Sequence, residues 1–165
     1  MLINLFVAMS NLYGFTLFRD IQNLPIKLFF NFVVICSILM HLSETKHGLQ
    51  GIEPFNIYSH FFLNLDRFVA IMATIYCIYR ICFVIQSIDV QINIIFGLVS
   101  LYISENHIKM DFPFNGECII YKYINYSSLN QILFALLHSF WHIQAYYILY
   151  KIGTDEGVYA HEIEK

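Results

Sequence analysis

Five runs of apolar residues follow one another along the chain, and short polar segments separate them. A helix of about 20 apolar residues crosses the hydrocarbon core of a bilayer. The pattern therefore predicts an all-α protein, a polytopic transmembrane bundle of about five helices. The fourth run is the weakest, because it is short and contains Gln91 and Asn93. The runs cover residues 1–18, 26–42, 61–84, 90–104 and 129–152.

The segments between the runs have the composition of turns and loops. Asn23-Leu24-Pro25 predicts a turn between the first two runs. Residues 43–59 and 105–128 combine charged residues with glycine and proline, which predicts loops outside the hydrocarbon. We expect one transmembrane domain over residues 1–152, followed by an acidic polar tail, 153–165, that frays.

Composition points to a membrane protein as well. Hydrophobic residues make up 58% of the 165 residues and charged residues only 13%, whereas a soluble domain is about 45–50% apolar and about 25% charged. The net charge is -3, and no basic stripe is present to neutralise a phosphate backbone. We therefore expect a membrane lipid as partner and no nucleic acid.

The cysteines and the first run carry less information. Neither a zinc ribbon nor a redox CxxC is present, and we interpret Cys36, Cys77, Cys82 and Cys118 as small apolar fillers rather than as disulfide partners. The first run lacks a basic segment and a small-residue cleavage site, which favours a membrane span over a removed signal peptide.

Orientation follows from the loop charges. With the N-terminus outside or in a lumen, the inner side carries one more basic residue than the outer loops, which favours this orientation in the plasma membrane or an endomembrane. The inner residues are Arg19, Lys27, Arg80 and Lys151, and the outer ones are Lys46, Lys109 and Lys122.

Five polar residues within the runs are candidates for function, because polar groups are costly inside a membrane. His138 and His142 are four residues apart, which places both imidazoles on one helix face, where they can bind the same ion. Ser37 and His41 repeat this spacing at the end of the second run, and Asp66 lies near the start of the third.

The order of the spans brings these residues together. In a five-span chain the second span ends on the membrane side where the third and fifth begin, so all three polar groups meet on one side. His41, His138 and His142 would then supply three imidazoles. Three protein ligands with an open fourth position are typical of a catalytic zinc, whereas a structural zinc normally has four.

Simpler explanations stay open for each residue. The pair His138 and His142 can arise by chance, with rings that bond a backbone carbonyl or lie among the headgroups. His41 is close enough to a span end to be interfacial, and Ser37 alone could be a hydroxyl at a helix contact. The other histidines, which are His47, His60, His107 and His161, are expected to be solvated.

Together these residues resemble the SxxxH, Asp and HxxxH signature of the CREST superfamily. The matching segments are Ser37-Ile38-Leu39-Met40-His41, Leu65-Asp66 and His138-Ser139-Phe140-Trp141-His142. The superfamily includes alkaline ceramidases, progestin and adipoQ receptors, and the myomaker-like transmembrane-protein-eight family. The last is the most similar, since Ser10-Asn11-Leu12 also resembles its first span.

The resemblance implies that His41, His138 and His142 bind Zn²⁺, with Ser37 and Asp66 near the water that the metal activates. It also implies seven spans, so this chain would be a shortened or fragmentary form that lacks about two spans before the HSFWH segment. The loss of two spans leaves the second, third and last spans with their polar residues on the same membrane side.

Two functions from different classes follow from this resemblance. The first is a membrane-embedded zinc hydrolase of a lipid ester or amide, with Asp66 as general base and Ser37 as hydrogen-bond donor to the oxyanion. One branch of the family is a phospholipase acting on glycosylphosphatidylinositol (GPI) anchors, so a phospholipid or GPI ester is the first substrate expected and ceramide the second.

The alternative is a non-enzymatic multi-pass protein of cell fusion or signalling with a structural metal site. A cavity that reaches from the metal to the lipid would discriminate between the two. A transporter is disfavoured, because no span has the glycine or proline break that such folds use.

Overall fold

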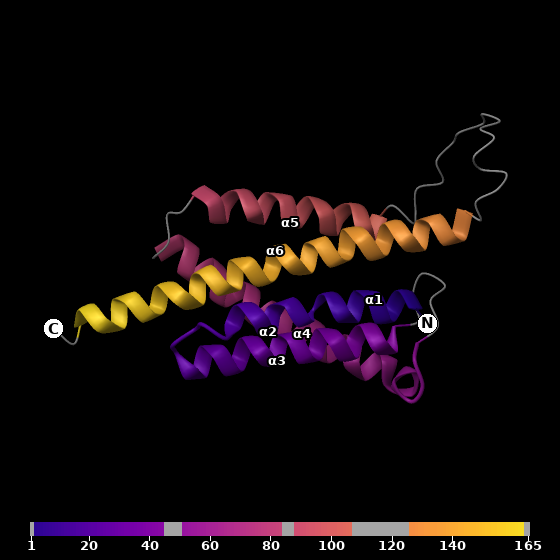
Figure 1. Ribbon diagram of the computed structural model, residues 1–165, viewed down its shortest axis with the longest axis horizontal. Helices are drawn as coiled ribbons and strands as arrows, with labels where there is room; N and C mark the ends of the chain where they lie inside the picture. The colour runs from indigo at the N-terminus through magenta and orange to yellow at the C-terminus, as the bar shows by residue number, and fades with distance from the viewer. Residues whose placement is uncertain (1, 45–50, 84–87, 107–125, 164–165) are drawn as a thin grey trace.

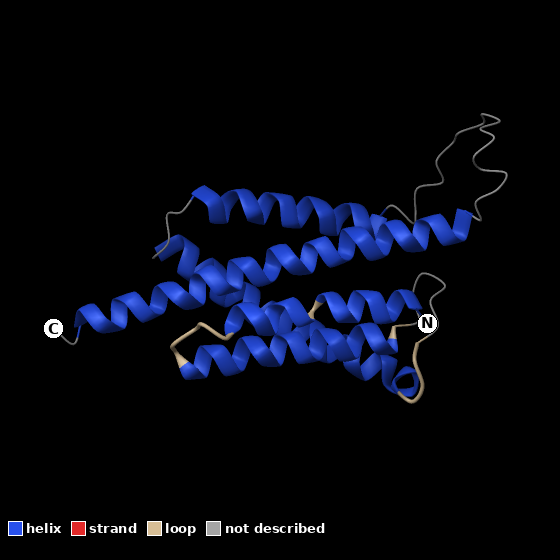
Figure 2. Cartoon of the chain, in the orientation of Figure 1, coloured by secondary structure: helices blue, strands red, loops and turns tan. Residues whose placement is uncertain are grey.

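The computed structural model describes the backbone of residues 2–44, 51–83, 88–106 and 126–163, and the side chains of residues 2–44, 51–81, 88–104 and 131–154. Within these ranges every regular element is a helix (Figure 2). The all-α prediction is therefore confirmed. Three helical segments are long and apolar enough to cross a membrane, and two shorter apolar ones, Leu2–Phe18 and Ile88–Ser104, accompany them; the three are Leu24–Ser43, Phe55–Ile81 and Gln131–Thr154.

The first apolar run forms two helices instead of the single one that its hydropathy predicts. α1 (Leu2–Ser10) and α2 (Leu12–Phe18) meet at Asn11. The buried Asn11 side chain donates to the carbonyl of Val7 at 2.9 Å and accepts a hydrogen bond from the Tyr146 hydroxyl. Asparagine competes with the helix backbone for hydrogen bonds, and here its amide is tied to another helix. The break therefore coincides with a contact between helices, which hydropathy does not reveal.

α3 (Leu24–Ser43) begins where the sequence predicts a turn. Asn23 caps the helix by accepting a hydrogen bond from the backbone N–H of Ile26 at 3.3 Å, and Pro25 occupies the first turn, where its missing N–H has no consequence. The helix ends at Ser43, and Glu44 leaves it with an extended backbone.

The remaining α-helices follow the predicted runs, and one short 3-10 helix lies within the predicted loop 43–59. The 3-10 helix η2 (Phe55–Tyr58) leads into α4 (Ser59–Phe83), and α5 (Ile88–Asn106) and α6 (Tyr126–Ile163) complete the chain. The sequence predicts an end of the last helix near residue 152, but α6 continues to Ile163. No proline interrupts this extension, and Gly153 allows α6 to lie directly against Ile21 and Phe30.

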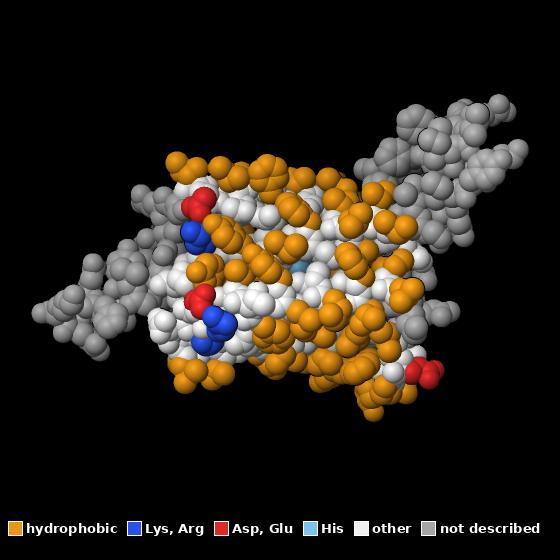
Figure 3. Space-filling model, in the orientation of Figure 1, with side chains coloured by type: hydrophobic (Ala, Val, Ile, Leu, Met, Phe, Trp, Pro, Cys, Tyr) orange, Lys and Arg blue, Asp and Glu red, His pale blue; other side chains and the backbone are white. Residues whose placement is uncertain are grey.

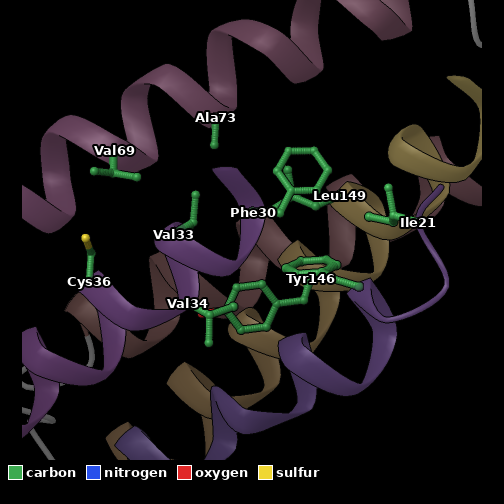
Figure 4. Packing of buried hydrophobic residues seen from close by; sticks show 10 residues of the cluster. Ile21, Phe30, Val33, Val34, Cys36, Val69, Ala73, Tyr146 and Leu149 are labelled. Carbon is green, nitrogen blue, oxygen red and sulfur yellow. The ribbon is translucent and has the colours of Figure 1, made fainter. Parts of the chain in front are cut away.

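α6 is central to the arrangement (Figure 1). It lies between α5 on one side and the α1 and α2 pair on the other, while α3 packs against α1, α2 and α4. A cluster of buried side chains joins α2, α3, α4 and α6, with Tyr146 and Phe30 near its middle (Figure 4). The ring of Phe18 lies 5.3 Å from that of Phe30 and 5.8 Å from that of Tyr146.

Much of the outer surface is apolar. Figure 3 shows hydrophobic side chains spread over the face in view, with the basic side chains gathered at its left-hand side. The ion pairs Arg19–Asp20 and Lys151–Asp89 are exposed or half-exposed. α4 is especially exposed, since only 11% of its apolar span is buried. A long helix with an apolar and exposed surface is suited to contact with lipid.

Close packing around Gly14 generates a testable prediction. A Cβ added at Gly14 would lie 2.5 Å from Cγ2 of Val34 and 3.2 Å from the Tyr146 ring. Gly14→Val should therefore force α2 away from α3 and α6 and lower the free energy of unfolding by about 1–3 kcal/mol. Thermal unfolding in detergent measures this, with Thr16→Val on the exposed side of the same helix as control. Equal melting temperatures for the two variants would contradict the close contact.

Candidate metal centre

Three histidines from two helices converge in the interior of the protein. His41 lies near the end of α3, and His138 and His142 lie one turn apart on α6. All three are buried, with at most 7% of each residue exposed. One ring nitrogen from each lies within 4.8 Å of the others. The predicted convergence of these imidazoles is confirmed, and His41 is buried within the protein.

The spacing of the nitrogens fits a metal ion. Nε2 of His41 and Nε2 of His142 are 3.3 Å apart. Two ligands about 2.0–2.1 Å from a tetrahedrally coordinated zinc lie about 3.3–3.4 Å from one another. Other divalent transition metals also accept imidazole ligands. The pair His41 and His142 therefore has the spacing of two ligands on a zinc-type ion, and the three histidines are close enough to hold a metal without selecting one.

Each imidazole is oriented through its other nitrogen. Nδ1 of His41 lies 2.9 Å from a carboxylate oxygen of Glu44. Nδ1 of His138 lies 3.4 Å from the hydroxyl of Ser104 on α5, and Nδ1 of His142 lies 3.4 Å from the hydroxyl of Ser10 on α1. Such partners fix the ring orientation and tautomer of metal-binding histidines.

The direction of these hydrogen bonds determines which nitrogen is available. The Ser10 hydroxyl donates its proton to the carbonyl of Val7 at 2.7 Å, and the Ser104 hydroxyl donates to that of Leu101 at 2.8 Å. Each hydroxyl can then only accept from the histidine, as the Glu44 carboxylate does. The Nδ1 atoms therefore carry the protons, and the Nε2 atoms have the lone pairs that a metal needs.

Sequence reasoning did not identify these three partners. Glu44 follows His41 by three residues, a spacing that could have suggested a contact at the helix end, but it fell in a segment interpreted as a loop. Ser10 carries a sequence signal only as part of Ser10-Asn11-Leu12, and no spacing links it or Ser104 to a histidine, since each lies far from its partner in the sequence.

Ser37 and Asp66 lie at the same site. The Ser37 hydroxyl, one turn before His41, is 3.5 Å from Nε2 of His142 and is buried. Asp66 on α4 is half-buried and lines one cavity together with Ser37, His138 and His142. Four of the five residues singled out in the sequence therefore line one cavity, and the fifth, His41, lies beside it with its ring nitrogen close to those of His138 and His142.

The cavity has a volume of about 760 Å³ and is bounded by α3, α4, α5 and α6. Its inner wall includes the buried His138 and His142. Its outer wall includes Ile71, Ile78 and Leu98, each more than half exposed on the apolar surface of α4 or α5. The cavity thus extends from the histidines to the apolar surface of the molecule.

The remaining histidines and cysteines are separate from this cluster where they can be placed. His60 is exposed, as the sequence predicts. Cys36 is buried, Cys77 is half-buried, and both are free thiols, in agreement with the prediction of apolar fillers. The other predictions concern residues outside the described side chains, namely His47, His107, His161, Cys82 and Cys118.

The fold and the site together define a helical protein with three helices long enough to cross a membrane and a buried cluster of three histidines that could hold a metal. Comparison of the chain with protein-family models, with curated proteins and with solved structures finds no match.

The Glu44 contact predicts a change in metal affinity. Glu44→Ala removes the acceptor at Nδ1 of His41 and should weaken Zn²⁺ binding by about 10–100-fold, the usual effect of losing such a partner. Glu44→Gln keeps an acceptor oxygen and should weaken binding less. Chelator competition on the purified protein measures the affinity, with His142→Ala as the variant that removes a ligand and the exposed Glu53→Gln as control. Unchanged affinity in Glu44→Ala would contradict this role for Glu44.

Proposed function

We propose that this protein is a membrane-embedded, multi-pass, zinc-dependent hydrolase of a lipid ester or amide. The observation that carries the proposal is the cavity that connects the three-histidine cluster with the apolar surface of α4 and α5. A structural metal site does not require such a cavity, whereas a lipid hydrolase needs a path for its substrate. The resemblance to the CREST signature at Ser37, His41, Asp66, His138 and His142 supports the same function.

The number of ligands also favours catalysis over a structural role. Among the residues that the structure describes, no fourth His, Cys, Asp or Glu joins the three histidines in a cluster of ligand atoms. The neighbouring carboxylate of Glu44 is engaged with Nδ1 of His41. Three protein ligands leave a position for water or substrate. The alternative, a non-enzymatic protein of fusion or signalling with a structural metal, would be favoured by a closed site.

The residues around the cluster have distinct chemical roles in this proposal. A zinc ion held by His41, His138 and His142 would supply a Lewis acid able to polarise a carbonyl and to lower the pKa of water toward neutrality. Asp66 accepts the proton of the attacking water and later returns it to the leaving group. The Ser37 hydroxyl donates a hydrogen bond to the oxygen on which negative charge develops.

The charge of the cavity wall bears on the substrate. Arg67, next to Asp66, is exposed, and among the described side chains it alone brings a positive charge to the cavity wall. Guanidinium groups bind phosphate through paired hydrogen bonds. This supports a phospholipid or GPI ester as the substrate ahead of the amide of ceramide, which has no phosphate.

A pair of substitutions separates the general base from the metal ligands. Asp66→Asn preserves size and hydrogen bonding but cannot accept a proton, so hydrolysis should fall by about 10²–10⁴-fold while metal content is kept. His142→Ala should lose metal and activity together. Metal analysis of the purified variants and hydrolysis of phosphatidylcholine and ceramide in mixed micelles measure both quantities.

The exposed Asn64→Ala on the same helix is a matched control and should leave metal and activity unchanged. If Asp66→Asn loses the metal, Asp66 is a fourth ligand and the site is closed. The non-enzymatic alternative would then be the better one. Absence of hydrolysis by the metal-loaded unmodified protein would contradict the enzymatic function itself.

The proposed topology has its own test. With the N-terminus outside or in the lumen, Glu53 lies on the side of the metal centre and Asp20 on the cytosolic side. Both side chains are exposed. A membrane-impermeant thiol reagent should therefore label Glu53→Cys from outside and Asp20→Cys only after permeabilisation, with the unsubstituted protein as control. Labelling of both positions from the same side would contradict a membrane crossing by α3, the one candidate span between them.

A further inference from the structure

The cavity is polar at one end and apolar at the other. Near the histidines its wall carries Glu44, Asp66 and Arg67. Toward the far end of α4 the wall is formed by aliphatic and sulfur-containing side chains from three helices. They include Cys77, Ile78, Ile81, Ile94, Ile148 and Leu149. This division matches an amphiphile whose reactive carbonyl is at the polar end and whose hydrocarbon chain runs along α4.

A packed cluster lies at the apolar end. Val90, Ile148 and Ile152 form a buried group, against which Cys77, Ile81 and Ile94 pack. Ile81 and Ile94 therefore belong both to the cavity wall and to this cluster. Well-packed apolar clusters accommodate added methylene groups poorly. A chain that enters from the histidines thus meets a fixed end at this cluster.

The part of the cavity that runs along α4 from Asp66 to Ile81 is here called the groove. Its length can be estimated from the helix. Asp66 and Ile81 are separated by fifteen residues of α4, which corresponds to about 22 Å at about 1.5 Å per residue. An extended chain of single bonds advances about 1.2 Å per bond, since three backbone bonds span about 3.3–3.6 Å. The groove therefore holds about 18 carbons in extended conformation. Its volume of about 760 Å³ is within the usual range for ligand pockets.

We propose that this groove measures the acyl chain, so that the site selects substrates with a single chain of about 16–18 carbons in the cavity. Cys77 and Ile81 are the specificity-determining residues, because they line the part of the groove that the end of the chain occupies. The inference rests on the proposed lipid hydrolase function and adds the orientation and length of the substrate chain.

Two substitutions should shift the length preference in opposite directions. Cys77 lies eleven residues beyond Asp66, so Cys77→Phe should close the groove after about 14 carbons. Binding of an 18-carbon fatty acid should weaken at least about tenfold, while that of a 12-carbon acid stays within about twofold. Ile81→Ala should remove part of the end wall and move the optimum to about 20 carbons. Ile75, exposed on α4 and outside the cavity wall, provides the controls Ile75→Phe and Ile75→Ala.

The experiment has two readouts on the full-length protein in detergent. Calorimetric binding of saturated fatty acids of about 12–22 carbons tests the groove without requiring catalysis. Hydrolysis of phosphatidylcholines and ceramides with the same chains tests the proposed function. Opposite shifts of the binding optimum in Cys77→Phe and Ile81→Ala, with none in the Ile75 controls, would support the measuring groove even if no lipid is hydrolysed.

Different results would overturn it. A binding optimum that is the same in all variants, or no dependence on chain length in the unmodified protein, contradicts the groove even if lipids are hydrolysed. Metal content and thermal unfolding of Cys77→Phe show whether that variant is folded. If Cys77→Phe is unfolded, the change in the chain-length optimum of Ile81→Ala tests the groove by itself. A smaller side chain at this position cannot obstruct folding by steric overlap.

Discussion

The organisation of this protein depends on the need to satisfy three imidazole rings buried among apolar helices. A buried polar group without a hydrogen-bond partner is costly. Each Nδ1 therefore faces a polar group: Glu44 after α3, Ser10 on α1 and Ser104 on α5. These contacts join α1 and α5 to the two helices that carry the histidines. They also leave the three Nε2 atoms free of these partners, so that one set of interactions bears on both the packing of the helices and the candidate metal centre.

A few hydrogen bonds and one close glycine contact also join α1, α2, α3 and α6. Small residues and hydrogen bonds between helices are the contacts that join helices where the hydrophobic effect does not, as in transmembrane bundles. Gly14 provides a close approach of α2 to α3 and α6, Tyr146 donates to Asn11, and Asn4 donates to the backbone carbonyl of Glu44 at 2.7 Å. The last contact brings the N-terminal helix to the residue that orients His41.

α4 differs from this tightly joined group, and the difference produces the cavity. It packs on α3 but leaves most of its apolar surface exposed. The space between α4, α5 and α6 has polar residues at the histidines and aliphatic ones at its far end. A rigid site beside a loosely covered groove is an arrangement that holds reacting groups in place while an apolar substrate enters from the side. This combination is the physical basis of the proposed lipid hydrolysis.

The sequence by itself determined the helical class, the apolar runs and the three histidines, because helical periodicity and the order of spans are properties of local pattern. The spacing of His138 and His142 places both on one face, and alternating helix directions bring the end of α3 beside them. The break at Asn11, the extension of α6 to Ile163, the partners Ser10, Glu44 and Ser104, and the cavity were decided by the tertiary structure alone. Each depends on how far neighbouring helices are rotated and shifted relative to one another, and those displacements arise from side-chain packing between segments far apart in the chain.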